Sequence, residues 1–223
     1  MSYMWNEFNI KTFPAETIVY RDGKYCPDLS TLENKTIDKK YDLPVHIIYV
    51  GEISDDNNLN IELGADNQDI ILTVKIKNKK PAFFNIFIKN AGKNSKITAN
   101  VFIENFSEIT YECLTKHMSP DTDIFVTNKI WGDKNSKSVL SGSAIINKGC
   151  KNCNSDLNFL AMTEEGAKIE FMPAQKISSI PKTADHSAGI YSATDSQVQY
   201  LRQAGLGILE IKDVTKEAFL NDY

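Results

Sequence analysis

Stretches of alternating apolar and polar residues follow one another along the chain from residue 59 to about residue 178. In one of them Leu72, Val74 and Ile76 share a face, and this period of two indicates a β-strand. Turn-forming clusters rich in Gly, Asn and Asp separate the stretches, at residues 64–67, 90–94, 132–135 and 164–166. Successive strands start roughly a dozen residues apart, which is typical of sandwiches, barrels and β-solenoids. Periodicity does not choose among these architectures, and we find no strict sequence repeat.

The C-terminal part of the chain changes to a helical pattern. Residues 194–197 (Thr-Asp-Ser-Gln) have the form of a capping box, and Gly205 offers a C-terminal stop. A second, short helix is predicted from Val214 to Leu220, with Asp213 or Thr215 at its cap. We therefore divide the chain into a mixed N-terminal segment, a β core and a helical segment, over residues 1–50, 51–190 and 191–223.

The composition excludes several classes of protein. The chain has 223 residues, a net charge of −4 and a pI near 5.5, which argues against nucleic-acid binding, because neutralising phosphates requires a basic face. No run of 18 apolar residues predicts a membrane span, and the first residues lack the pattern of a signal peptide. Four cysteines do not make a disulfide framework, so we expect a reduced, cytoplasmic protein.

The cysteines include one C-x-x-C motif, Cys150 to Cys153. Two thiolates at this spacing can chelate a metal or form a redox pair, but a zinc site needs about two more ligands. The strand-like surroundings favour two cysteines in a turn between strands, so Cys150 and Cys153 are weak metal candidates. Cys26 and Cys113 are isolated, and packing is the expected role for both.

Three histidines remain as candidate ligands or proton carriers. His46 lies in an apolar run and is predicted to be a packed strand residue. His117 lies beside Met118-Ser119-Pro120 and is predicted to be in a turn. His186 adjoins Asp185 and small residues, a position suited to a ligand or proton relay, although a structural role is the commoner outcome. No nucleotide-binding, hydrolase or metalloprotease motif is present, so we do not expect an enzyme.

Residues 185–206, from Asp185-His186-Ser187-Ala188 through Tyr200-Leu201 to Gly205-Leu206, resemble the signature that closes the core of SufB and SufD. Upstream, residues 158–162 and 172–177 resemble the segment that precedes this signature in the same family. The resemblance covers about residues 140–210. It rests on many positions in the right order, and the rest of the β region fits the family in its succession of strands.

The resemblance implies a fold, a set of partners and a function. The fold would be a right-handed parallel β-helix (β-solenoid), all-β with a small C-terminal helical segment. The function would be that of a SufD-like scaffold in iron–sulfur cluster assembly. Such a subunit docks a SufC-type ABC ATPase through its terminal helices. It also pairs through its β-helix with a SufB-like subunit or with itself, so an edge strand near residues 168–177 is expected to meet a mate.

Individual positions refine what the resemblance implies. The position of the sulfur-accepting cysteine of SufB matches Asn158, and a SufB glutamate matches Ser187. An amide is not a nucleophile, so sulfur transfer through Asn158 is excluded. The interface histidine of SufD matches His186, which makes His186 the candidate for a cluster site.

The remaining expectations concern the helix and the cofactor. Gln199, Tyr200 and Gln203 are the candidate partner-binding residues, with Val198 and Leu201 packing inward. No cofactor is expected to be held stably, although an iron–sulfur cluster could be held transiently at a subunit interface.

Two alternatives stay open. In the first, a family member holds its cluster at Cys150 and Cys153. In the second, the chain is an unrelated β-solenoid that serves as a structural part or binds carbohydrate. A carbohydrate binder should expose rows of aromatic side chains, yet Trp5 and Trp131 stand alone in the sequence.

Overall fold

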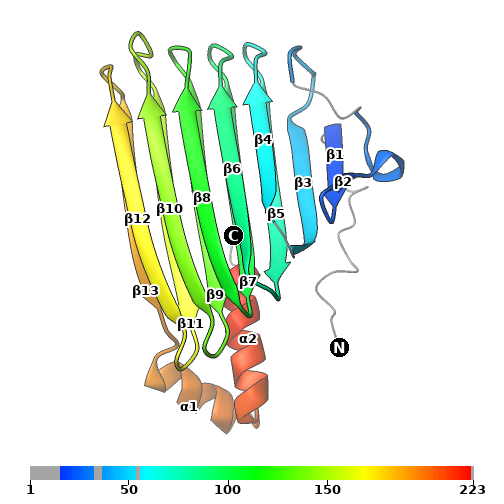
Figure 1. Cartoon of the computed structure of the whole chain (residues 1–223), viewed down its shortest axis with the longest axis vertical. Helices are drawn as coiled ribbons and strands as arrows, with labels where there is room; N and C mark the ends of the chain where they lie inside the picture. The colour runs from blue at the N-terminus through cyan, green and yellow to red at the C-terminus, as the bar shows by residue number, and fades with distance from the viewer. Residues whose placement is uncertain (1–15, 33–36, 54–55, 222–223) are drawn as a thin grey trace.

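The computed structural model describes residues 16–32, 37–53 and 56–221, whose strands coil into a parallel β-solenoid of about six turns (Figure 1). From β4 onward, each turn places one strand in each of two facing sheets. The predicted all-β class, the parallel solenoid and the helical end are confirmed. The strands are β1 (Glu16–Arg21), β2 (Lys24–Tyr25), β3 (Val45–Ile53), β4 (Asn57–Leu63), β5 (Asp69–Asn78), β6 (Ala82–Asn90), β7 (Lys96–Asn105), β8 (Glu108–His117), β9 (Asp123–Gly132), β10 (Lys137–Ile146), β11 (Asn154–Thr163), β12 (Lys168–Ile177) and β13 (Thr183–Tyr191).

The two sheets differ in length. The longer sheet has eight strands in the order β13-β11-β9-β7-β5-β3-β1-β2, and the shorter has five in the order β12-β10-β8-β6-β4. All neighbours within them are parallel except β1 and β2. The spacing between paired residues of adjacent turns is 29 between Glu16 and Val45, 25 between Val45 and Ile70, and 27 between Asn58 and Asn85. The spacing grows to 31 between Asp123 and Asn154, so the sequence carries no strict repeat.

The turns between strands are short because a few residues adopt left-handed backbone conformations. Asn67, Asn94, Asn135 and Asn152 have φ angles from 51° to 63°, which asparagine tolerates better than most residues. Gly92 has a different reason to be glycine, because a Cβ there would lie 1.9 Å from the carbonyl oxygen of Ala65 in the preceding turn. The Gly- and Asn-rich clusters of the sequence therefore mark the corners of the solenoid.

The interior between the sheets is filled by aliphatic residues and a column of stacked aromatic rings. Neighbouring ring centroids in the column lie 5.7 to 6.4 Å apart, within the range of favourable aromatic pairs. The column runs through successive turns as Tyr20, Tyr49, Phe84, Tyr111, Phe159 and Phe171. Gly142 makes room for it, since a Cβ there would lie 2.6 Å from the Phe159 ring.

Buried polar groups in the interior find partners across turns. The Tyr111 hydroxyl donates to Asn128 Oδ1 at 2.6 Å, and Asn128 Nδ2 donates to the Asn158 carbonyl at 3.0 Å. Asn78 Nδ2 donates to Asn105 Oδ1 at 2.8 Å, and Asn105 Nδ2 donates in turn to Ser138 Oγ. These hydrogen bonds add directional interactions between turns to a core that is otherwise held together by apolar contacts.

Two details of the strand prediction differ from the structure. Residues 108–117 form β8, which the alternation did not single out. His117, predicted to be in a turn, is the last residue of that strand and is fully buried. The predicted boundary at residue 50 falls inside β3, which pairs with both β1 and β5. The described part of the N-terminal segment thus continues the long sheet, while residues 1–15 lie outside the described part.

Two helices follow the last strand, α1 (Asp195–Gln203) and α2 (Ile208–Asn221). The predicted capping box is present, since Gln197 N donates to Thr194 Oγ1 and Thr194 N donates to Gln197 Oε1. The prediction for the second helix was too short: α2 begins at Ile208, where Glu210 accepts a hydrogen bond from Gly207 N. Asp213 and Thr215 therefore lie inside α2 and are not caps. No helix among residues 16–32, 37–53 and 56–221 could span a membrane.

We predict that Phe159→Ala lowers the free energy of unfolding by about 3–5 kcal/mol, because it removes a fully buried ring from the aromatic column. Urea denaturation followed by circular dichroism measures this. Phe83→Ala is the matched control, since the Phe83 side chain is 52% exposed, and we expect a change within about 0.5 kcal/mol. Equal effects of the two substitutions would contradict the assigned core.

Candidate functional site

The last turn of the solenoid, β12 and β13 with residues 178–182 between them, lies at an open end (Figure 1). We call this the terminal coil. Each of its strands is the outermost strand of its sheet, with no described strand beyond it. Phe171 is only half-buried, while Leu140 and Phe159 in the preceding turn are fully buried. The terminal coil therefore presents both the open apolar end of the interior, which we call the mouth, and unpaired backbone groups.

Backbone hydrogen bonds show which groups of β12 are free. Lys168 N donates to Ser136 O and Ser178 N donates to Ile146 O, so the even-numbered residues face β10. The odd-numbered residues direct their N–H and C=O groups away from the molecule, because successive residues of a strand alternate. Pro173 belongs to this outward set and has no N–H. The free edge of β12 is thus interrupted at its centre.

The free edge of β13 is not interrupted. Thr183 N donates to Cys153 O, so the odd-numbered residues face β11. The outward set consists of Ala184, His186, Ala188 and Ile190, and each of these residues has an N–H. Their side chains lie on the inner side of the sheet, since His186 is in register with the buried Leu157.

His186, the candidate cluster-site residue, is therefore exposed on an edge strand. Asp185 is its neighbour in sequence but lies on the opposite face of the sheet, because strand residues alternate. The structure brings together the two positions at which the resemblance departs from SufB: Asn158 and Ser187 are in register, and Ser187 Oγ donates to Asn158 Oδ1 at 2.5 Å.

Cys150 and Cys153 lie in the turn between β10 and β11, as predicted, and both are buried. Cys150 Sγ donates to the His117 carbonyl at 3.4 Å, and Cys153 Sγ lies 3.2 Å from Thr122 Oγ1. Burial raises the pKa of the Cys150 thiol, and the nearby Cys153 adds to this effect. A buried thiol with a raised pKa is a poor nucleophile and a poor metal ligand.

His117 completes this buried group. Its Nδ1 lies 2.8 Å from Thr122 Oγ1, and its Nε2 has no hydrogen-bond partner among the residues that the structure describes. Burial lowers the pKa of His117 to about 4, against a smaller opposing effect of Asp123. Within residues 16–32, 37–53 and 56–221, no three His, Cys, Asp or Glu side chains are placed to hold a metal ion. The geometry of this cluster therefore fits a structural role.

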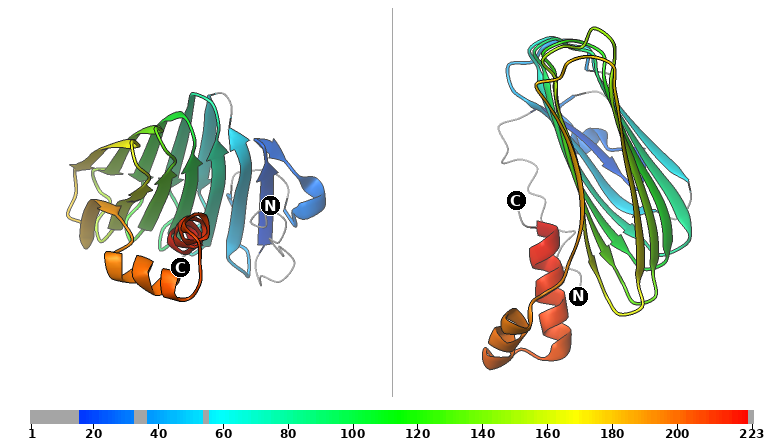
Figure 2. Two further views of the ribbon diagram at one scale, coloured as in Figure 1. Left: turned by 90° about the horizontal axis from the view of Figure 1, so that it is seen from below. Right: turned by 90° about the vertical axis from the view of Figure 1, so that its left-hand side faces the viewer.

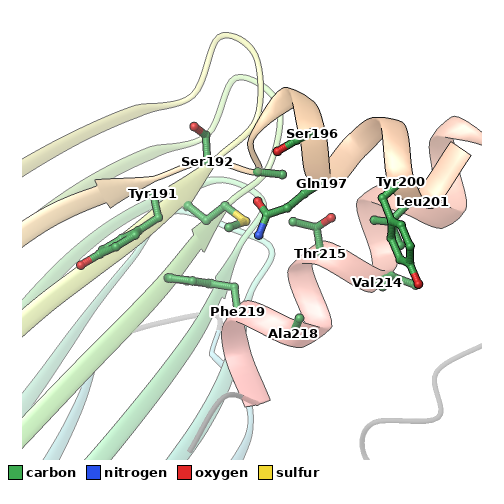
Figure 3. Close-up of a pocket in the computed structure, with 12 residues that line it drawn as sticks. Tyr191, Ser192, Ser196, Gln197, Tyr200, Leu201, Val214, Thr215, Ala218 and Phe219 are labelled. Carbon is green, nitrogen blue, oxygen red and sulfur yellow. The ribbon is translucent and has the colours of Figure 1, made fainter.

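The candidate partner-binding residues lie on α1. Gln199, Tyr200 and Gln203 are exposed, whereas Val198 and Leu201 are half-buried on the other side of the helix. Tyr200 and Leu201 also border a groove of about 910 Å³ between the two helices and the end of β13 (Figure 3). Its other lining residues are Met162, Tyr191, Ser192, Ala193, Ser196, Gln197, Val214, Thr215, Ala218 and Phe219.

Helix α2 is fixed to the outer face of the long sheet (Figure 2). Lys212 Nζ lies 3.3 Å from Asp133 Oδ1 and 2.6 Å from Glu164 Oε2. Lys216 Nζ lies 3.4 Å from Glu104 Oε2, and both ammonium groups lie about 5 Å from the ring centroid of Trp131. The groove beside α2 therefore has one rigid wall.

The contacts of α2 and the free edge of β13 were not predicted, whereas an edge strand near residues 168–177, now β12, was expected from the resemblance. The alternation of the sequence shows which residues share a face, but it does not show which strand is outermost. Pro173 was the available signal, since a proline within a strand indicates an edge.

Most of the described large apolar side chains that are exposed lie on the terminal coil and the two helices; the exceptions are Leu43, Ile71, Phe83 and Met118. Ile180 is 80% exposed and Ile190 is 61% exposed in the terminal coil, and Leu209 is 76% exposed at the start of α2. Others on the terminal coil and the two helices are Met172, Ile177, Tyr191, Tyr200, Ile208 and Val214. Concentrated exposed apolar surface marks sites of interaction with other molecules.

The sequence matches no protein-family model, and a search of curated proteins likewise finds no match.

We predict that the protein loses stability as the pH falls from about 6.5 to about 4, because unfolded His117 takes up a proton that the folded ring does not. The loss attributable to this residue is on the order of 3 kcal/mol and levels off below pH 4. Urea denaturation at several pH values measures it. His117→Leu should flatten the profile in this window, whereas His186→Ala should not. An unchanged profile in His117→Leu would contradict the assignment.

Proposed function

We propose that the chain is a SufD-like, non-catalytic scaffold subunit of iron–sulfur cluster assembly. One observation carries the proposal: most of the exposed large apolar side chains of the described residues lie on the terminal coil and the two helices, and β12 and β13 of the terminal coil each have a free backbone edge. These are the two elements through which a SufB- or SufD-like protein is expected to assemble. The parallel solenoid with terminal helices is the architecture that the sequence resemblance implies.

The positions that carry the resemblance also support the proposal. The matched region, residues 140–210, runs from β10 into α2 and so contains the terminal coil and α1. Within it, Asn158 and Ser187 are adjacent, and His186 lies on the free edge. Asn158 and Ser187, which match two functional positions of SufB, thus lie side by side, although they are far apart in the sequence.

Each element has its own proposed partner. The helical segment, with Gln199, Tyr200 and Gln203 exposed, docks a SufC-type ATPase. The terminal coil meets a SufB-like subunit or a second copy of the chain. The outermost strands of the terminal coil have unpaired backbone groups beside the apolar mouth. A partner that contributes an edge strand of its own would pair with these groups and cover the apolar surface.

An iron–sulfur cluster is proposed as transient cargo between subunits. His186 is exposed and can ligate iron through a neutral imidazole, but a cluster needs several ligands, so another chain must supply the rest. The Cys150 and Cys153 pair prefers iron–sulfur chemistry by ligand type, yet both thiols are buried and hydrogen-bonded. The geometry therefore ranks His186 ahead of the pair.

The carbohydrate-binding alternative receives less support. Trp131 is only 3% exposed, because α2 packs over it, so it is not available to stack on a sugar. Trp5 lies outside the described residues. The aromatic column faces the interior and presents no row on the outer surface.

We predict that Tyr200→Ala combined with Gln203→Ala lowers the affinity for the SufC-type ATPase of the same genome by at least about tenfold, because exposed aromatic residues dominate such interfaces. Pull-down and calorimetry with the full chain measure it. Phe83→Ala removes an exposed ring from the short sheet and should leave the affinity unchanged. Equal binding by wild type and the double variant would reject this docking surface. Deleting residues 191–223 is a blunter test, because it also uncovers Trp131.

We predict that the protein purified alone is colourless and that anaerobic reconstitution gives a substoichiometric amount of cluster, because one chain supplies too few accessible ligands. If cluster forms, His186→Ala should reduce the iron content more than Cys153→Ser, as iron and sulfide analysis would show. The reverse ranking would move the site to the C-x-x-C motif. A stable stoichiometric cluster in a proven monomer would contradict the scaffold role.

A further inference from the structure

We propose that Cys150 and Cys153 are a redox modification site whose two thiols are joined into a disulfide by a small-molecule disulfide, such as oxidised glutathione, when the terminal coil opens above them. The part of the coil that covers the cysteines is residues 178–184, which we call the covering segment. The disulfide in turn loosens this segment. The inference goes beyond the proposed function and does not depend on it.

The two cysteines lie in a corner that is longer than its counterparts. The corners before β7 and β9 have five residues each, 91–95 and 118–122, whereas the corner before β11 has seven, 147–153. The chain bends at Asn152, whose φ angle is 57°, and Cys153 Sγ lies 3.5 Å from the Cys150 carbonyl oxygen. Both side chains belong to one buried cluster with Ile146. Two thiols held together at this spacing are suited to form a redox pair.

In the reduced chain the thiols are hydrogen-bond donors to the preceding corner. Cys150 Sγ donates to the His117 carbonyl at 3.4 Å. Cys153 Sγ lies 3.5 Å from the Ser119 carbonyl oxygen. One turn earlier a hydroxyl makes the equivalent contact, since Ser119 Oγ donates to the Ala91 carbonyl. A hydroxyl therefore suffices for this contact, and what a pair of thiols adds to it is the capacity to be oxidised.

The covering segment buries both thiols, so that Cys150 is 2% exposed and Cys153 is 0% exposed. The Cys153 carbonyl accepts hydrogen bonds from Lys182 N at 2.9 Å and from Thr183 N at 3.3 Å. Ala184 packs against the cysteine cluster. Because the coil is outermost, with no described strand beyond it, a local opening of this segment exposes the thiols while the layers beneath stay folded.

The thiols are unreactive while the covering segment is closed. Burial raises the pKa of the Cys150 thiol, and the thiolate is the species that attacks a disulfide. The reagent must also reach the sulfur atom, which the closed segment prevents. Oxidation therefore requires opening, and its rate depends on how often the segment opens.

Oxidation proceeds by two exchange steps. One cysteine thiolate attacks a sulfur atom of the reagent RSSR and expels one RS⁻, which takes up the proton that the cysteine has lost. The second cysteine thiolate attacks the protein sulfur atom of the mixed disulfide and expels the second RS⁻, which is protonated in the same way. In total two cysteine thiols are oxidised to one disulfide, and one RSSR is reduced to two RSH.

The disulfide weakens the support of the covering segment. Joined sulfur atoms carry no S–H, so the donors to the carbonyls of His117 and Ser119 are lost. The two side chains must also turn toward each other, which changes the contact with Thr122 and the packing beneath Ala184. Closure over the oxidised corner is therefore less favourable, and the terminal coil stays loosened until the disulfide is reduced.

The first test measures the oxidation in a Cys26→Ser background, which removes the half-buried thiol. The folded chain is incubated with oxidised glutathione, and peptide mass spectrometry should find a disulfide between Cys150 and Cys153. Lys182→Pro removes an N–H that bonds to the Cys153 carbonyl, so it should raise the rate about fivefold. Gln175→Pro, on the outward edge of β12, should leave the rate unchanged. No disulfide in the Cys26→Ser parent, or equal rates in the two proline variants, would overturn the proposal.

Circular dichroism shows whether both proline variants fold. If Lys182→Pro does not, the Cys26→Ser parent is oxidised instead in urea concentrations below its unfolding transition. The rate should rise with urea, because urea favours the open segment. A rate independent of urea would show that the reagent reaches the thiols in the closed chain, and would overturn the role of the covering segment.

The second test measures the consequence by hydrogen exchange and mass spectrometry of the reduced and oxidised forms. The amides of residues 178–184 should exchange about tenfold faster after oxidation, those of β5 and β7 should not change, and dithiothreitol should restore the slow rate. The double variant Cys150→Ser, Cys153→Ser keeps a donor at each position, so it should exchange slowly with or without oxidant. Equal exchange in the two redox forms would overturn the loosening of the coil.

Discussion

The hydrogen-bonded register between successive turns is the constraint on which the rest of the structure depends. Every strand except β2 pairs in parallel with the strand one turn away, so its side chains are stacked on their counterparts from the neighbouring turn. This stacking places Tyr20 on Tyr49 and Phe84 on Tyr111 in the aromatic column. It also places Asn78 on Asn105 in the interior hydrogen-bond ladder. The stacking also has a cost, because a parallel stack never closes on itself and leaves outermost strands at both of its ends, β12 and β13 at the C-terminal one.

Much of this fold could be predicted from the sequence, because its signals are local. Alternation located most of the strands, Gly and Asn marked the corners, and the capping box at Thr194 marked the start of α1. What alternation could not supply was the choice between a sandwich and a solenoid, since both bury one face of each strand. The family resemblance made that choice. The length of α2 was missed because Glu210, three residues after Gly207, supplies a cap that a search for Ser, Thr, Asp or Asn does not detect.

The candidate site was predicted less completely, because it depends on contacts between turns. The position of His186 on an edge strand and the pairing of Asn158 with Ser187 require the register of β11 and β13. The burial of Cys150 and Cys153 likewise depends on the neighbouring turn, where Thr122 and His117 contact them. No single stretch of sequence contains this information. The same is true of Trp131, which is an isolated aromatic residue in the sequence but contacts two lysines of α2 in the structure.

The attachment of α2 has a mechanical consequence. Its lysines reach Glu104 on β7, Asp133 just after β9 and Glu164 just after β11, so one rigid rod is tied to three consecutive layers of the stack. A stack of repeats normally frays from either end, one layer at a time. Here α2 links the layers near the C-terminal end, so these layers can separate only as a unit. Among the described contacts, α2 forms no such ion pairs with the layers that carry β1, β3 and β5. Under tension the molecule should therefore unravel from its N-terminal side, leaving the end that carries the proposed interfaces intact to the last.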